Sequence, residues 1–158
     1  RIPIPIATGE RFTTIYEFQA LLTRNAVEYL RVDVCLCGGI TGAKKVAAMA
    51  EAHNAMIVPH NPLSPVGLVA CLQLDAAIPN FAIQEYTTGF EAGVMVSLDR
   101  HLGHDIVDEA PVPVDGFVDI PTRPGIGIDL VADPAAVRPP FSKPVVMRLH
   151  KDGFPVDQ

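Results

Sequence analysis

The chain has 158 residues, 49% of them hydrophobic and 19% charged, which is too apolar for a disordered segment and enough for one globular core. Its formal net charge of -6 is spread along the chain, which argues against nucleic-acid binding and against an anionic-membrane surface. No apolar run approaches the ~20 residues of a membrane span, so we expect a soluble, cytoplasmic protein.

The three cysteines also favour a reducing compartment, because an odd number does not suit a disulfide framework. Cys35 and Cys37 are spaced as Cys-x-Cys within an apolar run that predicts a strand, so we interpret them as buried thiols and not as metal ligands. The absence of Met at the start, inside an apolar run, leads us to expect the later part of a longer polypeptide.

The first half alternates apolar runs with helical patterns. The runs predict strands at 2–7, 29–33, 55–59 and 81–84. Each run leads to a polar residue that strand propensity alone would not select, and these residues are Glu10, Asp33, His60 and Glu85. They lie roughly 25 residues apart, which is close to the length of one βα unit.

Helices are predicted between the strands. A capping box at Thr14–Glu17 begins a helix that ends near residue 24. A second helix follows the Gly38-Gly39 turn, with Thr41 as N-cap, and ends near residue 54. Ser64 followed by proline begins a third helix over 65–77.

This order predicts parallel βαβ units, so the four polar residues should meet at the carboxyl edge of the strands. In a (β/α)8 barrel that edge carries catalysis. Four ionisable side chains in register favour a site over four unrelated surface groups, although a doubly wound sheet with polar strand ends stays open.

The second half has a different pattern. Residues 111–120 predict two short strands around an Asp115-Gly116 turn, and 145–149 predict a last strand. The Gly125-Ile-Gly127 sequence precedes no helix start, so we interpret it as a loop and not as a nucleotide site. His101 and His104 are assigned to a solvated loop because Gly103 discourages a helix there.

Four segments carry a family resemblance: Ala7–Arg11, Val32–Thr41, Pro59–Pro65 and Pro79–Glu85. Together they resemble the later barrel strands of the mandelate racemase branch of the enolase superfamily, and within it the galactonate dehydratase type of acid-sugar dehydratase. The likeness covers about residues 4–88 strongly and the Pro/Gly-rich tail weakly.

The resemblance implies an α/β fold, the C-terminal half of a (β/α)7β TIM-type barrel. Residues 1–88 would form the barrel half, and 89–158 would return to a capping domain. Glu10 matches the third of three acidic Mg²⁺ ligands, Asp33 and His60 match an Asp-His dyad, and Glu85 matches a glutamate that hydrogen-bonds the substrate. The remaining N-terminal part, in the same or a second chain, would complete the enzyme, which we expect to be a homo-oligomer.

The implied reaction is Mg²⁺-dependent dehydration of an acid sugar, an aldonate such as galactonate. A proton α to a carboxylate is weakly acidic, so its removal by His60 needs a metal-stabilised enediolate, and Mg²⁺ suits carboxylate ligands. The chain has His60-Asn61 where galactonate dehydratases have His-Cys, which leaves the sugar open. A racemase, epimerase or cycloisomerase of the same superfamily, or a non-catalytic assembly module, also stays open, because the deciding residues would precede Arg1.

Overall fold

Three short parallel strands form the sheet of the computed structural model, which describes residues 3–62, 64–86, 103–140 and 151. Their order is β1 (Ala7–Thr8), β2 (Tyr29–Leu30) and β3 (Met56–Ile57). A parallel bridge from Ile57 to Phe81 adds the start of a fourth strand next to β3. The predicted parallel arrangement of these four segments is confirmed, although the regular strands are shorter than the apolar runs.

Backbone hydrogen bonds extend the ladder beyond the named strands. Arg31 N donates to Thr8 O at 2.9 Å, and His60 N donates to Val32 O at 2.9 Å. These bonds keep the strand ends in register past the last paired residues. The side chains that follow the strands therefore lie along one edge of the sheet.

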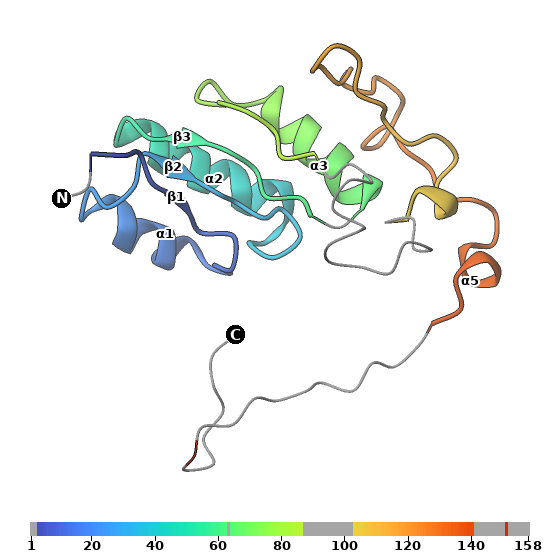
Figure 1. The fold of residues 1–158 in the computed structure, drawn as a ribbon, viewed down its shortest axis with the longest axis horizontal. Helices are drawn as coiled ribbons and strands as arrows, with labels where there is room; N and C mark the ends of the chain where they lie inside the picture. The colour runs from blue at the N-terminus through green and yellow to red at the C-terminus, as the bar shows by residue number, and fades with distance from the viewer. Residues whose placement is uncertain (1–2, 63, 87–102, 141–150, 152–158) are drawn as a thin grey trace.

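A helix follows each of the three strands and packs against its neighbours on one side of the sheet (Figure 1). The helices are α1 (Ile15–Leu22), α2 (Gly39–Ala52) and α3 (Pro65–Asp75). The core between helices and strands includes the fully buried side chains of Phe18, Leu30, Val46 and Ile57. This layering is the βαβ arrangement that the alternating pattern predicts.

Two of the predicted helix starts are confirmed. The Glu17 carboxylate accepts from the Thr14 backbone N–H at 2.9 Å, which is one arm of the predicted capping box. The Ser64 hydroxyl accepts from Gly67 N at 3.2 Å, with Pro65 as the first residue of α3.

The prediction for the start of α2 is wrong. Gly38 is the N-cap, with φ of 94°, and the helix begins at Gly39, two residues before Thr41. Gly42 explains why the chain enters the helix so early, because a Cβ there would lie 2.0 Å from the Cys37 carbonyl oxygen. Only glycine allows the turn and the first helical turn to approach this closely.

The predicted strand through Cys35 and Cys37 is also wrong. Hydrogen bonds from Leu36 N and Cys37 N to Asp33 O, 3.1 and 3.0 Å long, close a turn directly after Asp33. The turn exposes Cys35, so of the two thiols predicted to be buried only Cys37 is; Cys71, in α3, is buried as well. The apolar run marks the approach to a tight turn and not a longer strand.

In its described residues, the second half holds two short helices, η1 (His104–Ile106) and α5 (Pro134–Val137). His104 is exposed as predicted but begins a 3-10 turn and not a loop. The predicted hairpin is confirmed by the antiparallel bridge between Val114 and Phe117, because Asp115 and Gly116 both take positive φ, as a two-residue hairpin turn requires.

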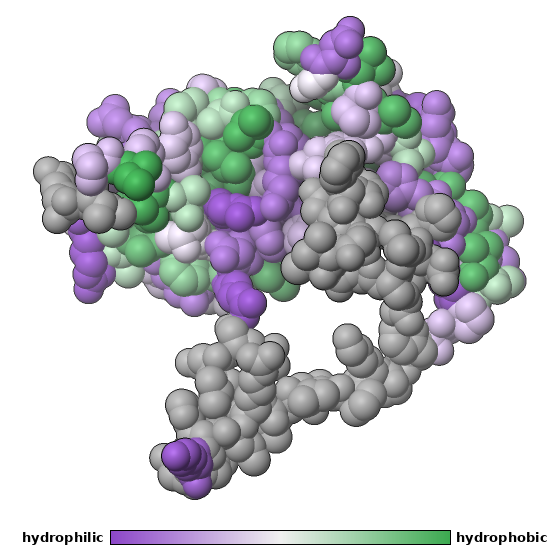
Figure 2. All heavy atoms as spheres, in the orientation of Figure 1, coloured by the Kyte–Doolittle hydropathy of each residue, from purple (hydrophilic) through white to green (hydrophobic). Residues whose placement is uncertain are grey.

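Apolar side chains lie on the surface of this second half. Figure 2 shows them as green patches, in the region where Figure 1 draws the segment in orange. The exposed ones are Val112, Val114, Phe117, Ile120, Leu130 and Val137. His101, the predicted strand at 145–149 and the predicted domain boundary at 88 lie outside the described residues. Within the described ranges, no helix is long and apolar enough to cross a membrane.

Candidate functional site

Four predicted site residues follow four parallel segments at the same edge of the sheet. Glu10 lies two residues beyond β1, Asp33 and His60 lie three residues beyond β2 and β3, and Glu85 lies four residues beyond the bridge at Phe81. Parallel strands place their carboxyl ends together, so this edge is the candidate site. The prediction that these segments end on one side of the sheet is confirmed.

Asp33 and His60 form the closest contact of the predicted set. Asp33 Oδ2 lies 2.9 Å from His60 Nδ1, and the Asp33 side chain is almost completely buried. Its other oxygen, Oδ1, accepts a 2.7 Å hydrogen bond from Cys35 N. With both oxygens accepting, the carboxylate fixes the imidazole with the proton on Nδ1 and the lone pair on Nε2.

Glu85 is held by one hydrogen bond and one ion pair from neighbouring segments. Its Oε2 accepts from the Asn61 backbone N–H at 2.9 Å and forms an ion pair with Arg31 Nη2 at 2.7 Å. Asn61 is the residue after His60, and Arg31 lies two residues before Asp33. Glu85 therefore links the ends of β2 and β3 and lies beside the Asp33–His60 pair.

Sequence reasoning missed Arg31. The signal was present, because Arg31 and Asp33 are two residues apart on an extended segment and such residues share one face. This spacing did not stand out because Arg31 lies inside an apolar run, which was interpreted as a buried strand. Its partner Glu85 comes from a distant part of the sequence.

Glu10 is half-buried in the turn directly after β1. Gly9 sets this turn with φ of 117°, and a Cβ there would lie 2.8 Å from the Phe18 ring, so glycine is required. The carboxylate is a hard oxygen donor of the kind that Mg²⁺ prefers. In the part of the chain that the structure describes, no group of three or more His, Cys, Asp or Glu side chains is arranged around a metal. The donor chemistry of Glu10 is thus compatible with Mg²⁺.

The thiols near the site are not poised for chemistry. Burial, and then the charge of Asp33, raise the pKa of Cys37 to about 11, and the same two causes raise the pKa of Cys35. Burial also raises the pKa of Cys71 far above neutrality. At neutral pH these cysteines are protonated.

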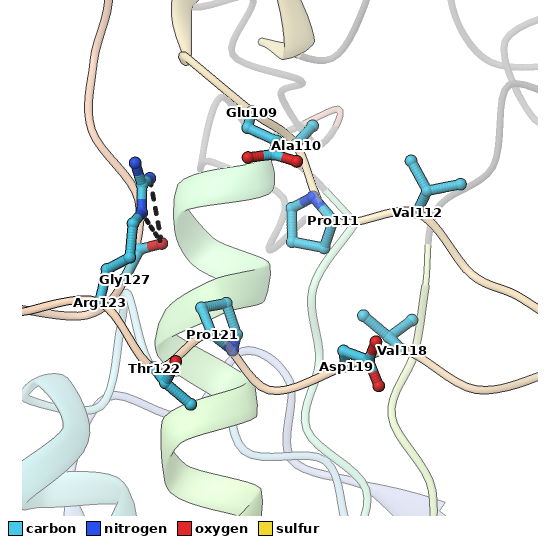
Figure 3. Close-up of a pocket in the computed structure, with 10 residues that line it drawn as sticks. All are labelled: Glu109, Ala110, Pro111, Val112, Val118, Asp119, Pro121, Thr122, Arg123 and Gly127. Atoms are coloured by element: carbon cyan, nitrogen blue, oxygen red, sulfur yellow. Dashed lines mark hydrogen bonds between the residues drawn. The ribbon is translucent and has the colours of Figure 1, made fainter.

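A pocket of about 390 Å³ lies in the second half and is separate from the strand-end site (Figure 3). Residues 109–112 line one side, and 118, 119 and 121–123 line the other, with the Arg123 side chain turned to the Gly127 carbonyl oxygen. Gln73 of α3 donates to Pro121 O and Ile126 O, which attaches this segment to the helical layer. None of the four predicted site residues lines the pocket.

Comparisons with known proteins identify the family of the chain. The family model described as "Enolase C-terminal domain-like" matches residues 1–134. A D-galactonate dehydratase of Variovorax paradoxus is 34% identical over 154 residues, which cover 95% of this chain and 39% of that protein. A D-galactonate dehydratase family member of Streptomyces bingchenggensis is 35% identical over 159 residues, which cover 98% of this chain and 36% of that protein. The chain therefore spans less than two fifths of the length of these relatives.

Solved structures give the same result. The crystal structure of an enolase from Pantoea ananatis with bound D-gluconate and Mg aligns with a TM-score of 0.73 at 32% identity, over 87% of this chain and 31% of that chain. An enolase from Agrobacterium radiobacter with bound sodium and L-malate aligns with a TM-score of 0.77 at 27% identity, over 94% of this chain and 39% of that chain. With its parallel βα units and a family match over most of its length, the chain belongs to the enolase C-terminal domain-like family.

Proposed function

We propose that this chain carries the second half of the active site of a Mg²⁺-dependent acid-sugar dehydratase. Such an enzyme removes the proton α to the carboxylate of a sugar acid and then expels a hydroxyl group from the β-carbon as water. The observation that carries the proposal is the 2.9 Å contact between Asp33 Oδ2 and His60 Nδ1 at the strand-end edge. A histidine oriented by a carboxylate there is suited to proton transfer near neutral pH.

His60 is the base in this proposal. Asp33 accepts the Nδ1 proton, so the Nε2 lone pair takes the α-proton of the substrate. The resulting imidazolium is stabilised by the Asp33 carboxylate, which is held in place by Cys35 N. The same protonated imidazole can then return its proton to a leaving hydroxyl group.

Glu10 would be a Mg²⁺ ligand, together with oxygen ligands from the rest of the enzyme. A bound Mg²⁺ supplies positive charge where the substrate carboxylate gains negative charge during proton removal. Glu85 contacts the substrate from the neighbouring strand end. Because the chain spans less than two fifths of its relatives, the remaining part of the barrel, in the same or a second polypeptide, would complete the site.

The substrate class in this proposal is an aldonate. The relatives are named D-galactonate dehydratase, and the Pantoea structure contains D-gluconate and Mg. We therefore test D-galactonate and D-gluconate with the complete enzyme in D₂O. Loss of water gives a 2-keto-3-deoxy acid, whereas a racemase or epimerase would return the same acid inverted at the α-carbon, and NMR separates these outcomes.

His60→Asn in the complete enzyme is the decisive variant. It should abolish both turnover and exchange of the α-proton with solvent deuterium, because it removes the base. The matched control is His53→Asn, since His53 is exposed at the end of α2 and away from the strand ends. Unchanged turnover of every aldonate by His60→Asn would overturn the proposal.

A further inference from the structure

Two backbone hydrogen bonds join β3 to the fourth parallel segment beside it. Ile57 N donates to Asn80 O at 2.8 Å, and Ala82 N donates to Ile57 O at 2.9 Å. In a parallel ladder the next bond would run from the N–H of residue 59 to Ala82 O. Residue 59 is proline, which has no N–H to donate. The regular ladder is therefore interrupted one residue before His60.

The side chain of Gln84 binds the carbonyl group at this interruption. In a regular ladder the backbone N–H of Gln84 would donate to Pro59 O. Here its side-chain Nε2 makes the bond, at 3.3 Å, and also donates to Glu85 O at 2.7 Å. Pro59 is fully buried, so water is not an alternative donor for its carbonyl oxygen. The carboxamide thus takes the place of a backbone group and connects the ends of the two segments.

The oxygen of the Gln84 carboxamide shows what fixes its orientation. Oε1 is buried and has no hydrogen-bond partner in the part of the chain that the structure describes. Reversing the amide would place Oε1 against two carbonyl oxygens, and none of these three atoms can donate. An unpaired buried acceptor is unfavourable, so the two bonds from Nε2 must offset its presence.

These contacts reach His60 through one peptide group. The carbonyl of Pro59 and the N–H of His60 belong to the same planar unit. The N–H donates to Val32 O at 2.9 Å on one side, and the carbonyl accepts from Gln84 on the other. A peptide group held at both ends cannot rotate, so it fixes the direction in which the His60 side chain leaves the backbone. That direction leads to Asp33, whose Oδ2 lies 2.9 Å from Nδ1.

We propose that Gln84 is a positioning residue for His60. This inference rests on the proposed function and deepens it. Gln84 acts through the Pro59–His60 peptide group and does not touch the reacting atoms. Proton transfer requires the base within hydrogen-bond reach of the proton, and a displacement of about 1 Å can slow a reaction about 100-fold. Gln84 therefore controls the rate of proton removal and not the binding of the substrate.

Two variants of the complete enzyme remove the donor. Gln84→Met keeps the length of the side chain without its polar hydrogens, and Gln84→Glu keeps the shape but replaces Nε2 with an oxygen. Gln73→Met is the matched control. Gln73 Nε2 also donates to two carbonyl oxygens, those of Pro121 and Ile126, but lies away from the strand ends.

Four measurements are made on each protein with Mg²⁺ and either D-gluconate or D-galactonate. Steady-state kinetics give kcat and KM, and NMR in D₂O gives the rate of α-proton exchange. Calorimetry gives the affinity for the aldonate and the number of binding sites per chain, which separates a displaced base from a partly unfolded protein. Crystal structures of the wild type and of Gln84→Met give the position of His60.

We expect kcat and α-proton exchange to fall about 10- to 100-fold in Gln84→Met, with KM nearly unchanged. Its affinity and number of binding sites should equal those of the wild type. In its crystal structure the Pro59–His60 peptide group should be rotated, and the contact between His60 and Asp33 should be longer than 2.9 Å. Gln84→Glu should lose at least as much activity, because its carboxylate repels the two carbonyl oxygens. Gln73→Met should keep the wild-type kcat.

Wild-type kcat in Gln84→Met would overturn the inference, and so would a loss of kcat that only follows a loss of binding sites. Full activity of Gln84→Glu would also overturn it, because packing alone would then explain the glutamine. A wild type that exchanges the α-proton of neither aldonate would remove the proposed function alone. The two crystal structures would still test Gln84, and an unchanged contact between His60 and Asp33 would then contradict its role.

Discussion

A methyl group on Gly67 would lie 2.6 Å from Asn61 Oδ1. Gly67 is in the first turn of α3, and Asn61 is buried in the segment that follows β3. The Asn61 backbone N–H in turn donates to Glu85. The first turn of a helix is thus in contact with a residue that positions the candidate site.

Gly67→Ala should destabilise the complete enzyme and weaken its binding of aldonates. Alanine is favoured over glycine in a helix by about 1 kcal/mol. Here the new methyl group must displace the Asn61 side chain, which strains the hydrogen bond from the Asn61 backbone N–H to Glu85. Thermal unfolding and calorimetric binding measure the two effects. Helix propensity alone predicts a gain in stability. That result would show that the Asn61 side chain moves aside without loss of stability.

Asp33→Asn should lower turnover while the protein stays folded. The amide retains the shape of the side chain but can present a donor to Nδ1, which favours the wrong imidazole tautomer. In serine proteases the same change at the aspartate of the catalytic triad costs about 10⁴-fold in kcat. Asp115→Asn is the control, because Asp115 lies exposed at a hairpin turn with positive φ that asparagine also tolerates. Equal activities of the two variants would contradict the role given to Asp33.

Glu10→Gln should weaken Mg²⁺ binding by the complete enzyme, because an amide oxygen is a poorer ligand for a hard dication than a carboxylate. His60→Asn should leave Mg²⁺ affinity unchanged, since it removes a base and not a ligand. Titration calorimetry with MgCl₂ measures both, with Glu51→Gln on the exposed face of α2 as the control. The assignment of Glu10 as ligand would have to be abandoned if His60→Asn, and not Glu10→Gln, lost the metal.

The buried carboxylate of Asp75 should make the free energy of unfolding depend on pH. Both of its carboxylate oxygens are buried without hydrogen-bond partners in the described ranges, and burial raises its pKa from 3.8 to about 7. Between these two values the folded protein keeps a proton that the unfolded chain has released, so the free energy of unfolding falls as pH rises through this window.

Asp75→Asn removes that ionisation and should flatten the dependence. The variant should exceed the wild type in stability at pH 8, by on the order of 4 kcal/mol at most, and differ little near pH 4. Denaturant unfolding at both pH values measures this, and Asp119→Asn, at an exposed position, is the control. If the wild type were as stable at pH 8 as the variant, the Asp75 carboxylate would have to be hydrated or hydrogen-bonded in solution.

The sequence predicted the parallel order and the edge on which the polar residues meet, because both follow from short-range patterns. Apolar runs alternate with helix starts at a regular interval, and one polar residue ends each run. The contact between Asp33 and His60 was also predictable, since adjacent parallel strands bring their ends together. The roles of Glu10, Asp33, His60 and Glu85 in catalysis stay predictions.

What the sequence did not predict depends on close packing or distant partners. Thr41 was the better N-cap by side-chain chemistry, but the approach of Gly42 to the Cys37 carbonyl sets the start of α2 two residues earlier. Cys35 is exposed because the chain turns at Asp33, and apolar patterning does not distinguish a turn from a longer strand. Arg31 pairs with a residue of another strand end, and no local pattern contains that partner.

The contacts of the candidate site join residues that are far apart in sequence. The Asp33–His60 and Asn61–Glu85 bonds span 27 and 24 residues, and each crosses one βα unit. Neither can form before the sheet has its final register, and a slip of one residue would turn the side chains to the opposite face. Catalytic competence should therefore appear last during refolding, after helix formation, so recovery of activity would report the moment at which strand alignment is complete.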